Sequence, residues 1–271
     1  MFIAKRPFLI LLKSTLEVIH QQLLNAIVMP EGPSIVLLKK EVLQFTGKKI
    51  VSVSGNSKID QNRLINKKVV SFQSWGKHFL ICFKGFTLRV HFLMFGTYRI
   101  NERKEQPVRL NITFKSGEIN LYSCSIKILE GDVNRHYDWS TDVMNDEWDA
   151  KNAKAKLKAE PANLICDALL EQNIFSGVGN IIKNEVLYRI RVHPESRVEK
   201  IPAIKIRKLI EEARNYSFEF LEWIRNYELK KHWLAHTKKI CLRCNLPIIK
   251  KYTGSKNRRS FFCANCQLLY N

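Results

Sequence analysis

Four cysteines near the end of the chain have the spacing of a metal site. They form two Cys-x-x-Cys pairs, Cys241 with Cys244 and Cys263 with Cys266, and 18 residues separate the pairs. Four thiolates in this arrangement can close a tetrahedral Zn²⁺ site, and because every ligand place is then filled, the metal would be structural. Two unrelated cysteine pairs are the alternative. The intervening residues have the character of a β-hairpin and carry Lys250, Lys251, Lys256, Arg258 and Arg259, so they could grip phosphates.

A second group of residues could bind a phosphate. Gly177 and Gly179 lie two residues apart, and Asn180 opens a segment with helical periodicity over 180–190. Glycines permit a tight turn, and the free N–H groups and positive dipole at a helix N-terminus suit an anion. An ordinary helix cap followed by a turn explains the same residues equally well.

The string Met29-Pro-Glu-Gly-Pro33 could supply a nucleophile. If translation starts at Met29 and that residue is removed, Pro30 gains a free secondary amine, which can attack an electrophilic sugar carbon and form an iminium. Glu31 beside it could then transfer a proton. Within the full chain, however, Pro30 carries an amide nitrogen, which is not nucleophilic. We therefore expect residues 1–28 to be absent from the mature protein. The alternative for the Pro-Glu-Gly-Pro string is that it only forms a turn by which the chain enters a helix.

The turn Gly76-Lys77 offers a cation between two strand-like runs. Lys77 could reach a phosphate or take part in acid–base chemistry, although a solvated turn lysine is the plainer interpretation.

The composition narrows the class of partner. The chain has 271 residues and a formal net charge of +20, and its last 89 residues hold 20 Lys and Arg against 8 Asp and Glu. Nucleic acid or an anionic membrane surface is the usual partner of such a charge. No run of about 18 apolar residues is present, so we expect no membrane span. Seven cysteines without a secretory segment indicate a reducing, cytoplasmic location, with Cys82, Cys124 and Cys166 as reduced core thiols.

The elements that must position these residues change character along the chain. After a helix opened by Gly32-Pro33, β-like runs follow at 50–54, 69–75, 78–83, 87–92, 98–101, 109–114 and 118–121. They predict an antiparallel sandwich or barrel. A polar connection over 137–161 leads to helical segments at 164–172, 180–190 and 204–227. Residues from Lys238 onward form the cysteine module.

Together and in this order, these motifs resemble the formamidopyrimidine-DNA glycosylase and endonuclease VIII family, from Met29 to Asn271. The Pro-Glu-Gly-Pro start is nearer to the endonuclease VIII branch. The resemblance implies a base-excision repair enzyme that flips a damaged nucleotide out of double-stranded DNA. It would remove the oxidised base through a Schiff base on the proline and cut the strand by β,δ-elimination.

The resemblance also implies roles for single residues. Pro30 would attack C1′, Glu31 would protonate the deoxyribose ring oxygen, and Lys77 would contact a phosphate near the lesion. Met94 would enter the gap that the flipped base leaves. Asn180 and Arg258 would clamp the phosphate backbone.

Two departures from the family pattern bear on the orientation of the sugar and on the lesion, respectively. Ser34 stands where the family usually has a second glutamate, and Ser125–Leu129 occupies the region of a Pro-Arg-Arg-Phe-Gly segment. The latter shifts the expectation toward oxidised pyrimidines. We expect the pocket loop just past Arg191. The side chains of His78 and His91 are interpreted as structural. Those of Trp223, Tyr227 and Trp233 are interpreted as helix packing and not as base stacking.

The expected fold is therefore α+β and multidomain. An N-terminal antiparallel β-sandwich with flanking helices (29–140) precedes a linker and helix–two-turn–helix domain (141–237) and a zinc finger (238–271). We expect one structural Zn²⁺, damaged double-stranded DNA as partner, a monomer, and a cytoplasmic protein that is nucleoid-associated if bacterial. A non-catalytic damaged-DNA-binding relative and a zinc-ribbon RNA-binding protein are the alternatives.

Overall fold

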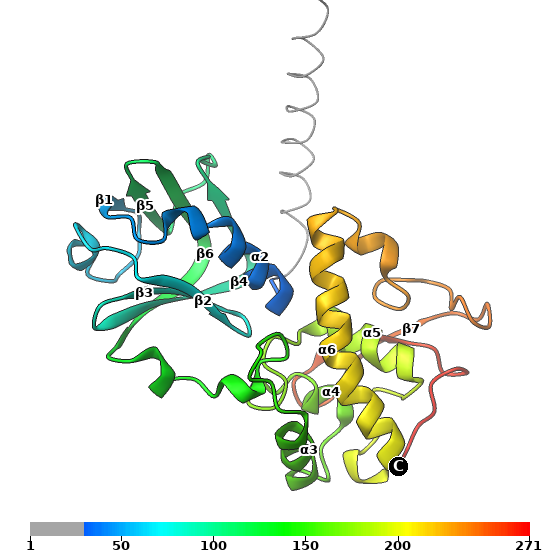
Figure 1. Cartoon of the computed structure of the whole chain (residues 1–271). Coiled ribbons are helices and arrows are strands. Elements are labelled where there is room, and N and C mark those ends of the chain that lie inside the picture. The colour runs from blue at the N-terminus through cyan, green and yellow to red at the C-terminus, as the bar shows by residue number, and fades with distance from the viewer. Residues whose placement is uncertain (1–29) are drawn as a thin grey trace, which may run out of the picture.

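The chain folds into a sheet domain and a helical domain that lie side by side (Figure 1). The structure is a computed structural model, and it describes residues 30–271. The expected extension, 1–28, and the expected start at Met29 lie outside the described residues. No described helix is both long and apolar enough to cross a membrane.

Helix α2, Gly32–Glu41, connects the two domains. Pro33 lies in its first turn, where a proline has no hydrogen bond to lose. The helix buries Ile35 and Leu38 and packs against strands β2 and β3 on one side and helix α6 on the other. Its N-terminal end therefore lies between the domains, and its C-terminal end lies over the sheet domain (Figure 1).

The sheet domain is built on one six-stranded antiparallel sheet with the order β1-β5-β6-β4-β3-β2. The strands are β1 Ile50–Ser54, β2 Ser71–Trp75, β3 His78–Phe83, β4 Phe86–Ile100, β5 Leu110–Phe114 and β6 Gly117–Glu130. The sequence predicted an antiparallel sandwich, and its two halves belong to one continuous sheet. The long strands β4 and β6 run through both halves and join them. Side chains from both halves join one apolar core.

Strand β4 differs from the sequence expectation. The runs expected at 87–92 and 98–101 are one strand, whose pairing with β6 shifts register between Phe92 and Thr97. Leu93, Met94 and Phe95 all point into solvent at this irregularity, so the alternation that marks a strand is lost there. Strand β6 likewise runs nine residues past the predicted end at Leu121.

The helical domain contains α3 Ala150–Ala159, α4 Ile165–Ala168, α5 Asn180–Ile190 and α6 Ala203–Arg225. Helix α4 is shorter than the segment expected at 164–172, because the chain turns after Leu169. The Gln172 side chain then accepts a hydrogen bond from Gly177 N at 3.1 Å. Single 3₁₀ turns occur at Leu43–Phe45, Asn62–Leu64, Val133–Arg135, Trp139–Thr141, Val198–Lys200 and Leu229–His232.

The C-terminal module is the expected hairpin. Strands β7, Ile249–Thr253, and β8, Arg258–Phe262, pair antiparallel. The hairpin packs against α5, which brings its basic residues next to the turn that precedes α5.

Candidate active site and nucleic-acid interface

The Glu31 carboxylate caps a helix that begins 149 residues later in the chain. It accepts hydrogen bonds from Ile181 N at 2.7 Å and Ile182 N at 3.2 Å, in the first turn of α5, and the residue is 1% exposed. Burial raises the pKa of Glu31, while Lys77 and the backbone N–H groups of α5 act in the opposite direction. The sequence predicted that the N-terminus of α5 could bind a phosphate. The N–H groups on its inner side instead donate to the carboxyl group of Glu31.

Glycines let three loops meet at this point. A Cβ on Gly179 would overlap the carboxyl of Glu31, and one on Gly76 would lie 2.8 Å from Gly177 N. Gly32 N donates to Gly177 O at 2.9 Å. The three motifs that looked separate in the sequence are therefore in direct backbone contact, and side chains at these glycines would push them apart.

Lys77 lies on the turn between β2 and β3, half-buried beside Glu31. Burial lowers the pKa of Lys77, and the nearby cations Arg258 and Lys256 lower it further, whereas Glu31 raises it. The turn is held by Asp142, whose carboxylate accepts from Gly76 N at 2.9 Å. Burial raises the pKa of Asp142 to about 6.

Asn180 and Arg258 lie close to Glu31 and Lys77. The Asn180 amide donates to Arg259 O at 3.0 Å, while its carbonyl oxygen is buried without a hydrogen-bond partner among the described residues. Arg258 begins β8 and is exposed. The fold therefore brings Glu31, Lys77, Asn180 and Arg258 to one place.

Sequence reasoning missed the residues that dock the finger onto the helical domain. The buried Lys183 ammonium donates to Ser260 Oγ at 2.9 Å, and Asp167 accepts from the backbone nitrogens of Ser255 at 2.7 Å and Lys256 at 3.2 Å. The sequence does contain a signal for these contacts, because Lys183 and Asp167 lie on the inner sides of their helices. Lys and Asp are rarely buried without a partner, so a partner segment was to be expected.

The four cysteines fit a metal ion. Their Sγ atoms all lie within 4.8 Å of one another, with 3.9 Å between Cys241 and Cys266 and 3.5 Å between Cys244 and Cys263. A tetrahedral Zn²⁺ with bonds of about 2.3 Å requires sulfur separations of about 3.8 Å. The Tyr188 hydroxyl lies 3.2 Å from Cys241 Sγ and can orient that ligand from outside.

Met94 projects from the sheet domain together with its neighbours. Leu93, Met94 and Phe95 are 52%, 57% and 80% exposed, which is unusual for three successive large apolar side chains. Only Met94 was singled out from the sequence, because nothing in the sequence showed that all three share one exposed bulge.

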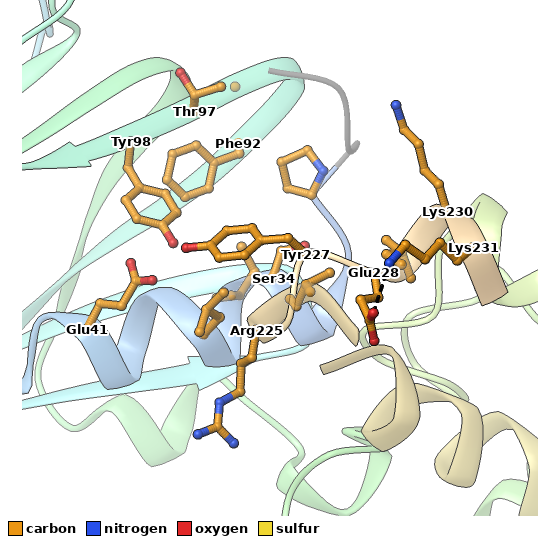
Figure 2. Close-up of a pocket in the computed structure, with 16 residues that line it drawn as sticks. Ser34, Glu41, Phe92, Thr97, Tyr98, Arg225, Tyr227, Glu228, Lys230 and Lys231 are labelled. Atoms are coloured by element: carbon orange, nitrogen blue, oxygen red, sulfur yellow. Dashed lines mark hydrogen bonds and ion pairs between the residues drawn. The ribbon is translucent and has the colours of Figure 1, made fainter. Parts of the chain in front are cut away.

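A cavity of about 310 Å³ opens beside Pro30. Its walls come from α2, from β4 next to the exposed bulge, and from residues 224–231 at and after the end of α6. Figure 2 shows the hydroxyls of Tyr98 and Tyr227 and the carboxyl of Glu41 pointing toward one another inside it. Ser34 also lines the cavity.

Tyr227 was expected to pack within a helix, and this interpretation is wrong. It lies just past α6 with a positive φ of 58°, and its ring enters the cavity (Figure 2). Burial raises the pKa of Glu41, against a hydrogen bond from Tyr98. Tyr98 has its pKa raised by burial and by Glu41.

The fold combines a sheet domain, a helix–two-turn–helix domain and a four-cysteine finger. The sheet domain and the helical domain meet at Glu31, next to Pro30. This combination defines a class of DNA glycosylase fold. A model of the formamidopyrimidine-DNA glycosylase N-terminal domain matches residues 29–124, and a model of the H2TH domain of that enzyme matches residues 140–217. The chain belongs to the formamidopyrimidine-DNA glycosylase and endonuclease VIII family.

Known proteins agree with this assignment. Endonuclease 8-like 3 of Xenopus laevis is 27% identical over 84% of this chain, although the match spans only 39% of that relative. Formamidopyrimidine-DNA glycosylase of Carboxydothermus hydrogenoformans is 24% identical over 88% of this chain and 100% of its own length. The solved structure of the Lactococcus lactis enzyme, non-covalently bound to DNA with an abasic site, superimposes with a TM-score of 0.78. It is 22% identical and covers 88% of this chain and 99% of its own.

Proposed function

We propose that this protein is a bifunctional DNA glycosylase and abasic-site lyase that removes oxidised bases from double-stranded DNA. One observation carries the proposal: Glu31, which follows Pro30 in the chain, lies against the first turn of α5 and beside Lys77, where Asn180 and Arg258 also lie. Nucleophile, acid and phosphate-binding groups are thus available to one nucleotide.

The reaction begins at the amine of Pro30 once it heads the chain. Its nitrogen lone pair attacks C1′, a C1′–N bond forms, and the bond from C1′ to the base breaks. The base leaves with the bonding electron pair and takes up the proton that the amine loses. Glu31 gives its proton to the sugar ring oxygen as the ring opens, and an iminium remains. Burial of Glu31, which raises its pKa, favours the protonated form that this step uses.

Strand cleavage follows from the iminium. Loss of a C2′ proton expels the 3′ phosphate, and a second elimination expels the 5′ phosphate, after which water releases the proline amine. Lys77 contacts a phosphate near the lesion, and its lowered pKa also suits it to accept a proton.

Extrusion of the base is supported by the exposed bulge and by the basic finger. Met94, with Leu93 and Phe95, fills the gap in the stack, which offsets an unstacking cost of a few kcal/mol. Asn180 and Arg258 hold the backbone, and a structural Zn²⁺ bound by Cys241, Cys244, Cys263 and Cys266 keeps the hairpin rigid.

The cavity beside Pro30 is the site we propose for the extruded base. Its recognition loop is then 224–231, and not the residues just past Arg191. Its apolar walls cannot distinguish base edges, so the hydroxyls of Tyr98 and Tyr227, backed by Glu41, carry the discrimination. An oxidised pyrimidine, with ring N–H and carbonyl groups on its edge, can hydrogen-bond with such a set.

Borohydride trapping on a duplex with one abasic site tests the chemistry. The full chain should be compared with a form that begins at Met29 and has lost that methionine. A covalent product from the short form alone supports the lyase and the expected start. No product from either form would favour the non-catalytic DNA-binding relative. Effective competition by double-stranded RNA would favour the RNA-binding alternative.

A further inference from the structure

Five lysines gather at the end of the sheet domain away from the candidate active site. We call this surface the basic edge; it consists of Lys48, Lys49, Lys67, Lys68 and Lys115. Lys49 and Lys68 face each other in an antiparallel bridge. Ile50, the residue after Lys49, pairs with Phe114 of β5, and Lys115 directly follows Phe114. The segment of Lys49 thus lies between the segments of Lys68 and Lys115. Positive charge is therefore carried by three adjacent chain segments.

The charges of the basic edge are not neutralised within the protein. All five side chains belong to exposed residues, and none of them takes part in an ion pair between described residues. Like charges placed directly opposite each other across strands destabilise a sheet. The arrangement at Lys49 and Lys68 is thus unfavourable unless an anion comes between them.

The basic edge lies apart from the candidate active site. The edge begins past the C-terminal end of α2, whose ten residues span about 15 Å from the Glu31 end. Lys68 lies before β2, and Lys77 comes just after it, so the five residues of that strand separate them by about 17 Å. In Figure 1 the β1 and β5 end of the sheet lies on the side of the domain remote from the helical domain.

We propose that the basic edge is a second DNA-binding surface, which engages the phosphate backbone of a DNA segment outside the one held at the active site. Adjacent segments of a sheet lie about 4.8 Å apart, so the ammonium groups form a row along which a phosphate backbone can lie. DNA is the occupant that the charge selects here, since the proposed function already holds this polymer next to the protein. The inference rests on the DNA-binding part of that function.

Salt dependence of DNA binding measures this surface directly. The five lysines are changed together to glutamine in the full chain, and affinity is measured against salt concentration. Two lesion-bearing duplexes are used, one of roughly 12 and one of roughly 60 base pairs; each lost phosphate contact lowers the slope by about 0.9. We expect the slope to fall by about 2.7 to 4.5, which corresponds to three to five contacts, on the long duplex and to stay unchanged on the short one.

Two further variants make the result specific. A set with all five lysines changed to arginine keeps the charge and should retain the original slope on the long duplex. A control with the same loss of charge changes five exposed lysines of the helical domain to glutamine, namely Lys151, Lys154, Lys158, Lys200 and Lys208. Equal losses in control and test, or no change on the long duplex, would overturn the proposal. Failure to bind the short lesion duplex at all would instead contradict the proposed function.

Discussion

The carboxylate of Glu31 accepts a hydrogen bond from Ile181 N at 2.7 Å, across 150 residues of sequence. One side chain therefore links the expected nucleophile on the sheet domain to the first turn of α5 in the helical domain. The acid cannot move without disturbing the turn that presents Asn180. If Glu31 and Asn180 act as proposed, proton transfer and phosphate binding are coupled through this contact.

Glu31→Gln tests the acid. Glutamine keeps one oxygen for the α5 backbone but has no carboxylic proton to give. Base excision should fall at least about 100-fold, within the range that general acids contribute, while affinity for abasic DNA stays near normal. Single-turnover excision and equilibrium binding measure the two effects. Unchanged excision would exclude Glu31 as the proton donor.

Gly179→Ala tests the space that this acid occupies. The added Cβ would overlap the Glu31 carboxyl, so we expect a loss of about 1–3 kcal/mol of stability from overpacking and a steep loss of excision. Gly85→Ala is the control, since nothing lies within 4 Å of a Cβ there although its φ is positive. It should leave excision intact in the same unfolding and activity assays. Equal activity of both variants would contradict the packing argument.

Tyr227→Phe and Glu41→Gln test the cavity. Each removes a polar group from the proposed base pocket, so excision of an oxidised pyrimidine should drop about 10-fold, the equivalent of one hydrogen bond of about 1.4 kcal/mol. Cleavage at a ready-made abasic site needs no base and should keep its rate. Tyr137→Phe, which alters a hydroxyl 3.2 Å from His78 Nδ1 and outside the cavity, is the matched control. Parallel loss of both activities would show that the cavity does not read the base.

Cys241→Ser tests the metal site. Loss of one thiolate should release Zn²⁺ and loosen the hairpin that carries Arg258, so affinity for lesion DNA should fall at least about tenfold, as expected when a phosphate-contacting element is lost. Elemental analysis measures the zinc and gel-shift titration the affinity. Cys82→Ser, at a buried cysteine of the sheet domain, should retain the metal. A fully loaded Cys241 variant would contradict a four-cysteine site.

The pH dependence of stability tests Asp142. Its pKa rises from 3.8 in a free side chain to about 6 in the fold, so the folded state binds more protons between those values. The contribution of Asp142 to the free energy of unfolding should therefore be greatest below pH 4. It should decline by about 3 kcal/mol as the pH rises through 6. Urea unfolding across this range should show a smaller decline for Asp142→Asn. Identical profiles would mean that the carboxyl is not desolvated as described.

The sequence by itself determined the groups that can do chemistry. Cysteine spacing predicted the cluster that the structure contains, and the periodicity of residues 180–190 and the turns at Gly76 and Gly177 were confirmed, because each depends on neighbours within a few residues. The family resemblance and the antiparallel sheet were confirmed as well. The roles of Pro30, Glu31, Lys77, Met94, Asn180 and Arg258 in catalysis and DNA binding stay predictions.

Only the tertiary structure decided which of these groups meet. No local pattern shows that Glu31 caps α5, that Gly179 is required because a carboxyl group fills its side-chain space, or that Tyr227 leaves the helix pattern and enters a cavity with Glu41 and Tyr98. These relationships join segments up to 186 residues apart, and they depend on how the two domains pack against α2. The continuity of β4 was missed for the same reason, since pairing with β6 on either side of the bulge, and not alternation along the strand, holds it together.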